Sequence, residues 1–171
     1  INEYVAILDE TYVTGEDYGD GQGTGYNNML TMAEDNYDYW MSTGDGEVYT
    51  LELVSDRSVT VERGDTQVLT LLYNDYSDLG GAHGSYGYTG YSFDTQTGEL
   101  LTLDKLSSDT EGLRSFLTNY MVTAVENDDS LQERTAGFIP DDDYNAALSA
   151  LLREGSWYFS SSGMVIFSSL Y

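Results

Sequence analysis

The only histidine of the chain, His83, stands inside the stretch GGAHGSYGYTGYSFD, which runs from Gly80 to Asp94. An imidazole can serve as a general acid–base if an acid orients it and a nucleophile lies within its reach. Ser85 is close in sequence, but the nucleophile elbow G-x-S-x-G is absent, because His83 stands where its first glycine would be. We therefore expect a glycine turn with positive φ angles, in which His83 hydrogen-bonds across the turn to backbone, and no catalytic residues.

The same stretch carries a row of aromatic residues. Tyr86 and Tyr88 have one strand parity and Tyr91 and Phe93 the other. A one-residue bulge near Thr89-Gly90 would bring all four rings to one face. Such a row either packs in the core or forms a contact surface, and core packing is the preferred interpretation. The residues singled out as a structural turn and potential ligand contact are Gly80, Gly81, His83, Gly84, Tyr86, Tyr88 and Tyr91.

Acidic loops offer oxygen ligands for a metal ion. The segment EDYGDGQGTGYNN contains Glu16, Asp17 and Asp20, and the segments ENDD and PDDD contain more carboxylates. None has the ligand order of an EF-hand, so a solvated acidic loop is expected, with Ca²⁺ as the remaining alternative. The chain has no cysteine and a single histidine, which argues against thiolate catalysis and against zinc sites. No cofactor is predicted.

The charge of the chain is strongly unbalanced. Thirty Asp and Glu residues face six Lys and Arg residues, for a net charge of −24. Such a field repels nucleic acid and anionic membranes, attracts cationic partners, and by itself also keeps a protein soluble. No run is long and apolar enough for a transmembrane helix, and no signal peptide is visible. Because the chain opens on Ile1, we expect a trimmed or processed fragment.

Hydrophobic periodicity predicts two helices followed by strands. Helical spacing covers Ile1 to Tyr12 and again Tyr26 to Met41, with Gly44 as a stop. From Glu47 the period changes to two, and the segments around Val59, Val61 and QVLTLLY read as strands joined at Gly64-Asp65. YSFDTQTGELLTL is predicted to be a second hairpin, with Gly98 in a left-handed conformation.

The second half predicts two further helices and a closing hairpin. Leu113 to Val125 form an apolar helical stripe that includes Phe116 and Tyr120, behind a capping box at Ser108 to Glu111. A helix from Pro140 to Arg153, capped by Gly155, precedes the hairpin WYFSSSGMVIF. Elements in blocks predict an α+β fold, an antiparallel β-sheet with helices mainly on one face. We expect one compact unit, with a helical part at 1–46 and the α+β domain at 47–171.

The segment VTVERGDTQVLTLLYNDYSDLGGAHGSYGYTGYSFDTQTGELLTLDKL resembles the RsiV-like family of extracytoplasmic domains of largely unknown function. Such domains occur in anti-sigma factors, in N-terminal regions of some peptidoglycan deacetylases, and as stand-alone secreted proteins or lipoproteins. The matching elements are VLTLLY, the GGAHG turn, Thr97-Gly98, LLTLDKL and the closing WYFSSSGMVIFSSLY, so that the resemblance covers most of 47–171. Residues 1–46 resemble the family's N-terminal partner module only loosely, and Leu170 stands where the family has a proline.

The resemblance implies a non-catalytic binding or sensing module at the bacterial cell envelope, held at a membrane only through a segment outside this chain. Lysozyme recognition is known in the anti-sigma branch, and a strongly acidic surface is compatible with a cationic protein of that kind. A cell-wall glycan is the other ligand class that the resemblance implies. Two alternatives stay open: an accessory domain of a secreted deacetylase, and an uncharacterised hydrolase. The sequence does not define the oligomeric state.

Overall fold

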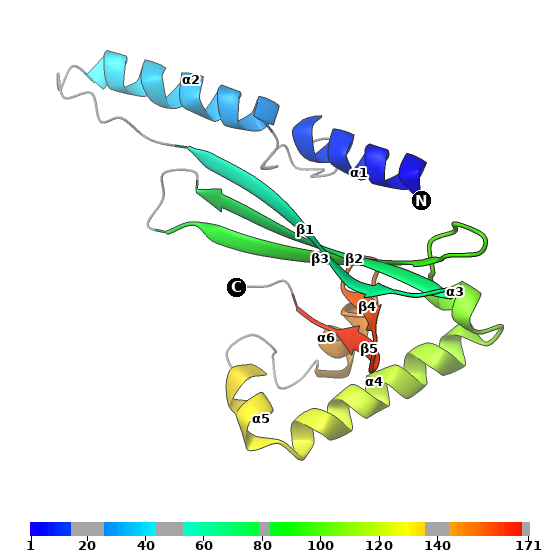
Figure 1. The fold of residues 1–171 in the computed structure, drawn as a ribbon. Helices are drawn as coiled ribbons and strands as arrows, with labels where there is room; N and C mark the ends of the chain where they lie inside the picture. The colour runs from blue at the N-terminus through cyan, green and yellow to red at the C-terminus, as the bar shows by residue number, and fades with distance from the viewer. Residues whose placement is uncertain (15–25, 44–52, 79–82, 136–143, 169–171) are drawn as a thin grey trace. The chain divides into compact units, whose positions relative to one another are not determined.

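The computed structural model describes residues 1–14, 26–43, 53–78, 83–135 and 144–168 (Figure 1). The helices are α1 (Asn2–Thr14), α2 (Tyr26–Thr43), α3 (Leu103–Leu106), α4 (Thr110–Glu126), α5 (Asp129–Thr135) and α6 (Tyr144–Ala150). The strands are β1 (Val54–Gly64), β2 (Val68–Asp78), β3 (Ser85–Asp94), β4 (Trp157–Ser160) and β5 (Gly163–Ile166). The antiparallel sheet has the order β1-β2-β3, and β4 and β5 form a separate hairpin. The predicted α+β fold class is confirmed.

The chain divides into two compact units, and each strand of the three-stranded sheet contributes to both. Unit 1 contains residues 1–59 and 73–87, and unit 2 contains residues 60–72 and 88–170. The division into 1–46 and 47–171 stays a prediction.

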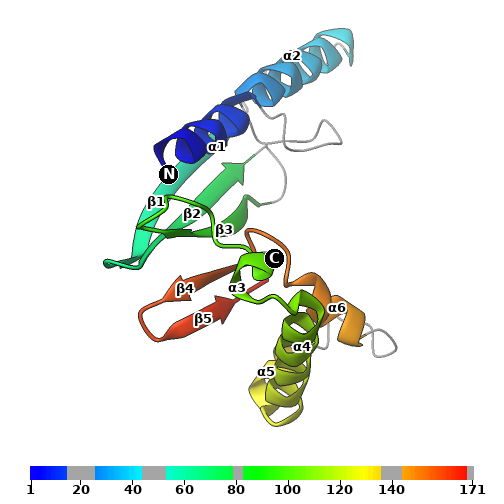
Figure 2. The same ribbon diagram turned by 90° about the vertical axis from the view of Figure 1, so that its right-hand side faces the viewer.

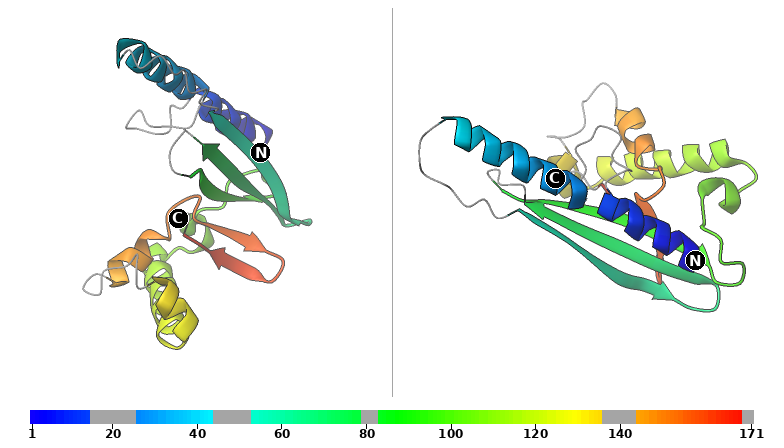
Figure 3. Two further views of the ribbon diagram at one scale, coloured as in Figure 1. Left: turned by 90° about the vertical axis from the view of Figure 1, so that its left-hand side faces the viewer. Right: turned by 90° about the horizontal axis from the view of Figure 1, so that it is seen from above.

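In unit 1, one arginine ties helix α1 to strands β1 and β2. The guanidinium of Arg57 forms a two-pronged ion pair with Asp75, with N–O distances of 2.6 and 2.7 Å, and donates from Nη1 to the carbonyl of Leu8 at 3.0 Å. It also lies 3.9 Å from the ring centroid of Tyr12 and 5.0 Å from that of Tyr73. Figure 3 shows α1 lying along these strands. A planar guanidinium can serve carboxylate, carbonyl and rings together, which fixes the helix on the sheet.

Unit 2 is built around the β4–β5 hairpin, whose alternating residues face two ways. Trp157 and Phe159 meet edge-on at 5.8 Å and contact the apolar core beneath α4. That core contains Leu103, Leu152 and Trp157, packed by Leu101, Leu113, Leu117, Met121, Phe159, Met164 and Ile166. Figures 1 and 2 show the hairpin between α4 and the unit 2 parts of the sheet strands. Tyr158 and Val165, of the opposite parity, point toward the sheet.

Two buried hydroxyls attach the hairpin to the sheet. Phe159 pairs with Met164 one position before the Ser160–Gly163 pair that closes the turn, so its N–H and C=O point away from β5. The Phe159 N–H donates to Ser92 Oγ at 2.9 Å, and Thr70 Oγ1 donates to the Phe159 carbonyl at 2.7 Å. Since Thr70 has spent its only hydrogen, Ser92 must be the donor in the 2.8 Å bond between the two hydroxyls. The three bonds form a closed ring in which every donor is used.

The β1–β2 turn falls at Gly64-Asp65, as the sequence predicts, and the structure shows that Asp65 organises it. Asp65 Oδ1 accepts hydrogen bonds from the backbone N–H groups of Gln67 and Val68 at 2.7 and 2.8 Å, and Oδ2 accepts from Arg63 Nε at 2.7 Å. These bonds, those to Val68 and Gln67 first, lower the pKa of Asp65 to about 2. The second predicted turn is also confirmed: Asp94 accepts from Gln96 and Thr97, and Gly98 has φ +77°.

The helices differ from their predictions at the ends. Asp109, and not Ser108, caps α4 by accepting from the Gly112 N–H at 2.9 Å, because an Asp side chain in this place reaches N3 directly. Helix α6 ends at Ala150 and does not reach Arg153. After Ala150 the hydrogen bonds run from Leu151 N to Leu148 O and from Leu152 N to Ser149 O, which is the i to i+3 pattern of a tighter 3₁₀ turn. The short helices α3 and α5 were not predicted.

The apolar stripe of α4 is also narrower than predicted. Leu113, Leu117 and Met121 pack on the core, whereas Phe116 and Tyr120 are 65% and 67% exposed. The apolar residues of α4 at i, i+3 and i+4 spacing therefore cover a wider stripe than the part of the helix surface that is buried. The predicted start of a helix after Pro140 and residues 47–52, where the period-two pattern begins, lie outside the described residues.

Replacing Ser92 by alanine should lower the free energy of unfolding by about 1–3 kcal/mol, because the partly buried Phe159 N–H loses its acceptor. Thr70→Val should cost a similar amount through the Phe159 carbonyl. Since both changes open the same ring, the double variant should cost less than the sum of the two. Urea denaturation of the three variants measures this, and strictly additive costs would contradict a closed ring.

The Asp65 turn should make stability depend on acid pH. A carboxyl whose pKa falls from 3.8 to about 2 on folding stabilises the folded state above the unfolded pKa. That contribution is lost as the pH falls from about 4 to about 2. Asp65→Asn, which cannot titrate, should therefore show a smaller loss of unfolding free energy over this range than the natural chain. Urea denaturation at several pH values checks this, with Thr66→Ala in the same turn as the control that keeps the natural slope.

Candidate functional site

Of the predicted glycine turn, the structure describes His83 and Gly84. His83 is exposed, and its Nδ1–H donates to the carbonyl of the adjacent Gly84 at 3.0 Å; the expected bond across the turn stays a prediction. Gly84 does not have the expected positive φ. Instead, a side chain there would collide with the Tyr76 ring, since a Cβ atom would lie 2.5 Å from Cε2 and 2.6 Å from Cζ. The expectation of positive φ is wrong at this residue, and space is the reason for the glycine.

The other members of the predicted turn fall partly outside the structure. Gly80 and Gly81 lie outside the described residues, so the structure says nothing of their conformation. Whether the turn contacts a ligand stays a prediction.

The tyrosines of β3 are more exposed than predicted. Tyr86 and Tyr88 are 52% and 42% exposed, and Tyr91 is partly buried. The preference for core packing is therefore wrong for Tyr86 and Tyr88. In unit 1 the Tyr86 ring packs on Tyr76, with ring centroids 4.7 Å apart. These rings pack on one another and on the sheet, and leave much of their surface available for contact.

Side chains of β3 alternate regularly through the place where a bulge was predicted. Gly90 faces the Tyr158 ring and Ser92 bonds to Phe159, so both point to the β4–β5 hairpin. Thr89 points to the opposite side, where its Cγ2 lies 2.7 Å from the position a Cβ would have on Gly155. This is the alternation of a regular strand, so the predicted bulge near Thr89-Gly90 is wrong, and Phe93 is buried on the face opposite Tyr88.

A small aromatic pocket lies where this hairpin meets the sheet in unit 2. We call it the aromatic pocket. Its lining residues are Leu72, Tyr88, Tyr158, Val165, Phe167 and Ser168, and its volume is ≈ 180 Å³. The rings of Tyr158 and Phe167 are 5.8 Å apart and inclined by 59°, so they form two walls at an angle. With Tyr88 42% exposed, the pocket presents aromatic faces and edges to its contents.

Gly90 allows the pocket to form. A Cβ at this position would lie 2.8 Å from Tyr158 Cδ1 and 3.0 Å from its Cβ, so the tyrosine occupies the space that a side chain would need. Because Tyr158 contacts Gly90 through its own Cβ, rotating the ring cannot relieve the collision. The glycine content of β3 thus reflects the close approach of the hairpin.

One carboxylate, that of Glu62, acts on the hydroxyl of Tyr158, which lines the aromatic pocket. Burial and, after it, the carboxylate of Glu62 raise the pKa of Tyr158. Arg63, which also approaches the hairpin through a 3.5 Å contact from Nη1 to the Ser160 carbonyl, is paired with Asp65 at 2.7 Å. The low pKa of Asp65 keeps that partner ionised. A cation in the pocket would therefore meet aromatic rings and a nearby carboxylate.

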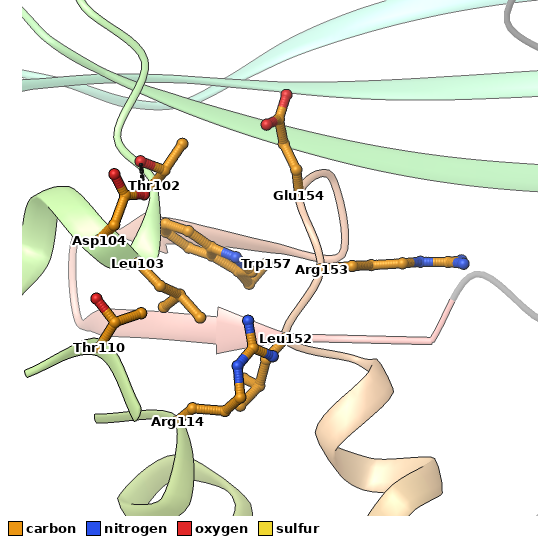
Figure 4. Close-up of a pocket in the computed structure, with 9 residues that line it drawn as sticks. All are labelled: Thr102, Leu103, Asp104, Thr110, Arg114, Leu152, Arg153, Glu154 and Trp157. Carbon is orange, nitrogen blue, oxygen red and sulfur yellow. Dashed lines mark hydrogen bonds between the residues drawn. The ribbon is translucent and has the colours of Figure 1, made fainter. Parts of the chain in front are cut away.

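A second pocket, with a volume of ≈ 250 Å³, opens over the core of unit 2 (Figure 4). It is lined by Thr102, Leu103, Asp104, Thr110, Arg114, Leu152, Arg153, Glu154 and Trp157. Asp104 accepts from Thr102 Oγ1 at 2.6 Å, which lowers the pKa of Asp104 and keeps it ionised. The Arg153 side chain extends away from Trp157 and donates from Nε to Ser156 Oγ at 3.0 Å.

The polar groups of this second pocket are engaged in the fold. Arg114 donates to the carbonyl of Ser149 at 3.4 Å, which joins α4 to the end of α6. Leu103, Leu152 and Trp157 are core residues, so the pocket is a depression above the core. An ionised Asp104 cannot donate a proton, and a general acid is therefore not available from it near neutral pH. Sequence reasoning did not find either pocket, because each combines residues from segments far apart in the chain.

The acidic segments are only partly described. Glu16, Asp17 and Asp20, and the carboxylates of PDDD, lie outside the described residues. From the ENDD segment, Asp128 caps α5 by accepting from Ser130 and Leu131 at 2.9 and 3.1 Å. In the described part of the chain no three His, Cys, Asp or Glu residues are grouped as a metal site would require. None of the described helices is long and apolar enough to cross a membrane.

No protein-family model matches the chain, and no curated protein matches it either. The resemblance to the RsiV-like family therefore rests on the quoted motifs alone.

Gly90→Ala should destabilise the protein by about 1–3 kcal/mol, because its methyl group would overlap Tyr158 at the start of that side chain. Gly87→Ala is the matched control in the same strand. A Cβ there meets nothing within 4 Å, so the change should stay within about 0.5 kcal/mol. Thermal or urea unfolding compares the two, and equal costs would contradict a role for Gly90 in seating Tyr158.

Proposed function

We propose that this chain is a non-catalytic, extracytoplasmic binding or sensing module of the bacterial cell envelope, with a cationic protein such as lysozyme as its partner. Membership of the RsiV-like family is part of this proposal. The observation that carries it is the charge of the chain combined with exposed aromatic side chains on β3. Acidic surface attracts a basic partner from a distance, and tyrosine rings supply contact area once it arrives.

The negative charge has little internal compensation. With 30 acidic and six basic residues, most carboxylates must be neutralised by solution cations or by a partner. Five of the six basic residues are already used in the fold. Arg57 is paired with Asp75, Arg63 with Asp65 and Lys105 with Glu99. Arg114 and Arg153, as described above, donate to Ser149 and Ser156. A basic partner therefore meets carboxylates whose charge this chain does not itself balance.

The chemistry of the described sites favours binding over catalysis. His83 donates from Nδ1 to backbone, and Asp104, the carboxyl at the second pocket with a lowered pKa, stays ionised. Both pockets are smaller than the roughly 300–1,000 Å³ that sites for small molecules usually have. Side chains of a protein partner fit such depressions better than a cofactor does.

Isothermal titration calorimetry against a cationic lysozyme tests the proposal. We expect saturable binding with one partner per chain at about 0.15 M salt, where the Debye length is about 8 Å. At about 1 M salt the Debye length falls to about 3 Å, and binding should weaken but persist. The affinity lost at high salt is the electrostatic part of the binding, and the affinity that remains comes from apolar contact.

The control is a second protein of similar size and net positive charge, such as cytochrome c. Specific recognition predicts clearly weaker binding of that control at both salt concentrations. The proposal is wrong if the two basic proteins bind equally well and both lose all binding at high salt, because this is the behaviour of a surface that attracts any cation.

A further inference from the structure

The geometry points to the aromatic pocket as a receptor for one cationic side chain, lysine or arginine, of a basic protein partner. This inference rests on the proposed function and goes beyond it by naming the residues and the chemical group that they bind. It concerns a site inside unit 2, formed by Tyr88 of β3, Leu72 of β2, and Tyr158, Val165, Phe167 and Ser168 of the hairpin segment.

The size of the pocket limits its occupant. At ≈ 180 Å³ it lies below the roughly 300–1,000 Å³ of sites for small-molecule ligands. It has room for a single side chain. Its walls are almost entirely apolar, with the hydroxyls of Tyr88, Tyr158 and Ser168 as the polar groups of its lining residues. A sugar ring would bury several hydroxyls against walls that offer few partners, at a cost for each group left unpaired.

The aromatic walls suit a cation. An ammonium or guanidinium group is attracted to the negative face of an aromatic ring, and several rings around one cation form the cage that recognises alkylated ammonium groups. Tyr158 and Phe167 stand at 59° with centroids 5.8 Å apart, and Tyr88 supplies a third ring. The methylene groups of a lysine or arginine stem would meanwhile pack on Leu72 and Val165.

Charge distinguishes a cation from a neutral apolar side chain as the occupant. The chain carries a net charge of −24, and Glu62 lies close enough to Tyr158 to act on its hydroxyl. Arg63, which contacts the Ser160 carbonyl of the hairpin, has its guanidinium paired with Asp65. A lysine or arginine entering the pocket therefore gains from the rings and from the surrounding negative field, whereas a leucine or phenylalanine gains only from burial.

Choline and its neutral isostere 3,3-dimethylbutan-1-ol separate these two occupants. The two molecules have the same shape and differ in charge. We expect choline to shift the ring-proton NMR signals of Tyr88, Tyr158 and Phe167 with a dissociation constant on the order of millimolar, and the neutral alcohol to bind much more weakly. Equal binding of the two compounds would show a merely apolar pocket and would overturn the inference. Shifts spread over the acidic surface, with none at these rings, would overturn it as well.

Variants of Tyr88 connect the pocket to the protein partner. Tyr88→Leu keeps an apolar side chain but removes the ring, and should weaken choline binding and binding of the basic protein by about three- to tenfold each. Tyr88→Phe keeps the ring and should retain both. Tyr120→Leu, at a tyrosine of α4 that is 67% exposed, is the matched control and should change neither. Unfolding curves establish that each variant is folded.

The outcomes separate this inference from the proposed function. If the basic protein binds specifically and Tyr88→Leu leaves that affinity unchanged, the proposed function stands and the aromatic pocket is not its contact site. If choline binds at the three rings and the basic protein does not bind specifically, the cation preference of the pocket is supported and the proposed function is wrong.

Discussion

The arrangement of unit 2 depends on how the backbone of Phe159 is satisfied. Its N–H and C=O face away from β5, and two sheet hydroxyls, on Ser92 and Thr70, take the place of a neighbouring strand. Thr70 and Ser92 are 0% and 2% exposed, so an unpaired group among them would be costly. Because each of the four groups joined by the three bonds has a fixed role as donor, acceptor or both, the hairpin has one position in which all are satisfied.

That position determines what the two faces of the hairpin do. With Phe159 held by its backbone, the side chains of Trp157 and Phe159 enter the core under α4. Tyr158 is then directed onto Gly90, and its ring becomes a wall of the aromatic pocket. The hydrogen bonds to Phe159 thus fix the orientation of the hairpin. Because side chains alternate along a strand, one face of the hairpin then enters the core and the other lines the aromatic pocket.

Much of this fold could be predicted from the sequence, because local signals are strong where they act over a few residues. The Asp65 and Gly98 turns and the closing hairpin follow from turn chemistry and period-two alternation. Helix ends were less predictable: Asp109 and Ser108 are both good capping residues, and only the folded geometry selects Asp109. The prediction of which α4 residues are buried was wrong for Phe116. The helical spacing that places Phe116 beside Leu113 does not say how much of the helix surface the neighbouring elements cover.

The candidate site was less accessible to such reasoning, and the glycines show why. Read locally, Gly84 and Gly90 indicate backbone freedom, and Gly90 even suggested a bulge. In the structure both positions require glycine because there is no room for a side chain: Tyr76 and Tyr158 occupy the space where Cβ atoms would be. The partner of Gly90 comes from the far end of the sequence, so no pattern near Gly90 reveals it.

The same contacts suggest a division of labour between charge and shape. The electrostatic field of the unbalanced carboxylates extends only about one Debye length, and it does not distinguish one basic protein from another. Discrimination must come from a place where a cation is desolvated against fixed groups, and an aromatic pocket built on a buried hydrogen-bond ring is such a place. An acidic surface alone would bind many basic proteins weakly. Under the proposed function, the ring of Tyr158, positioned by Gly90 and by the Ser92–Thr70 pair, would supply the part of the contact that selects among them.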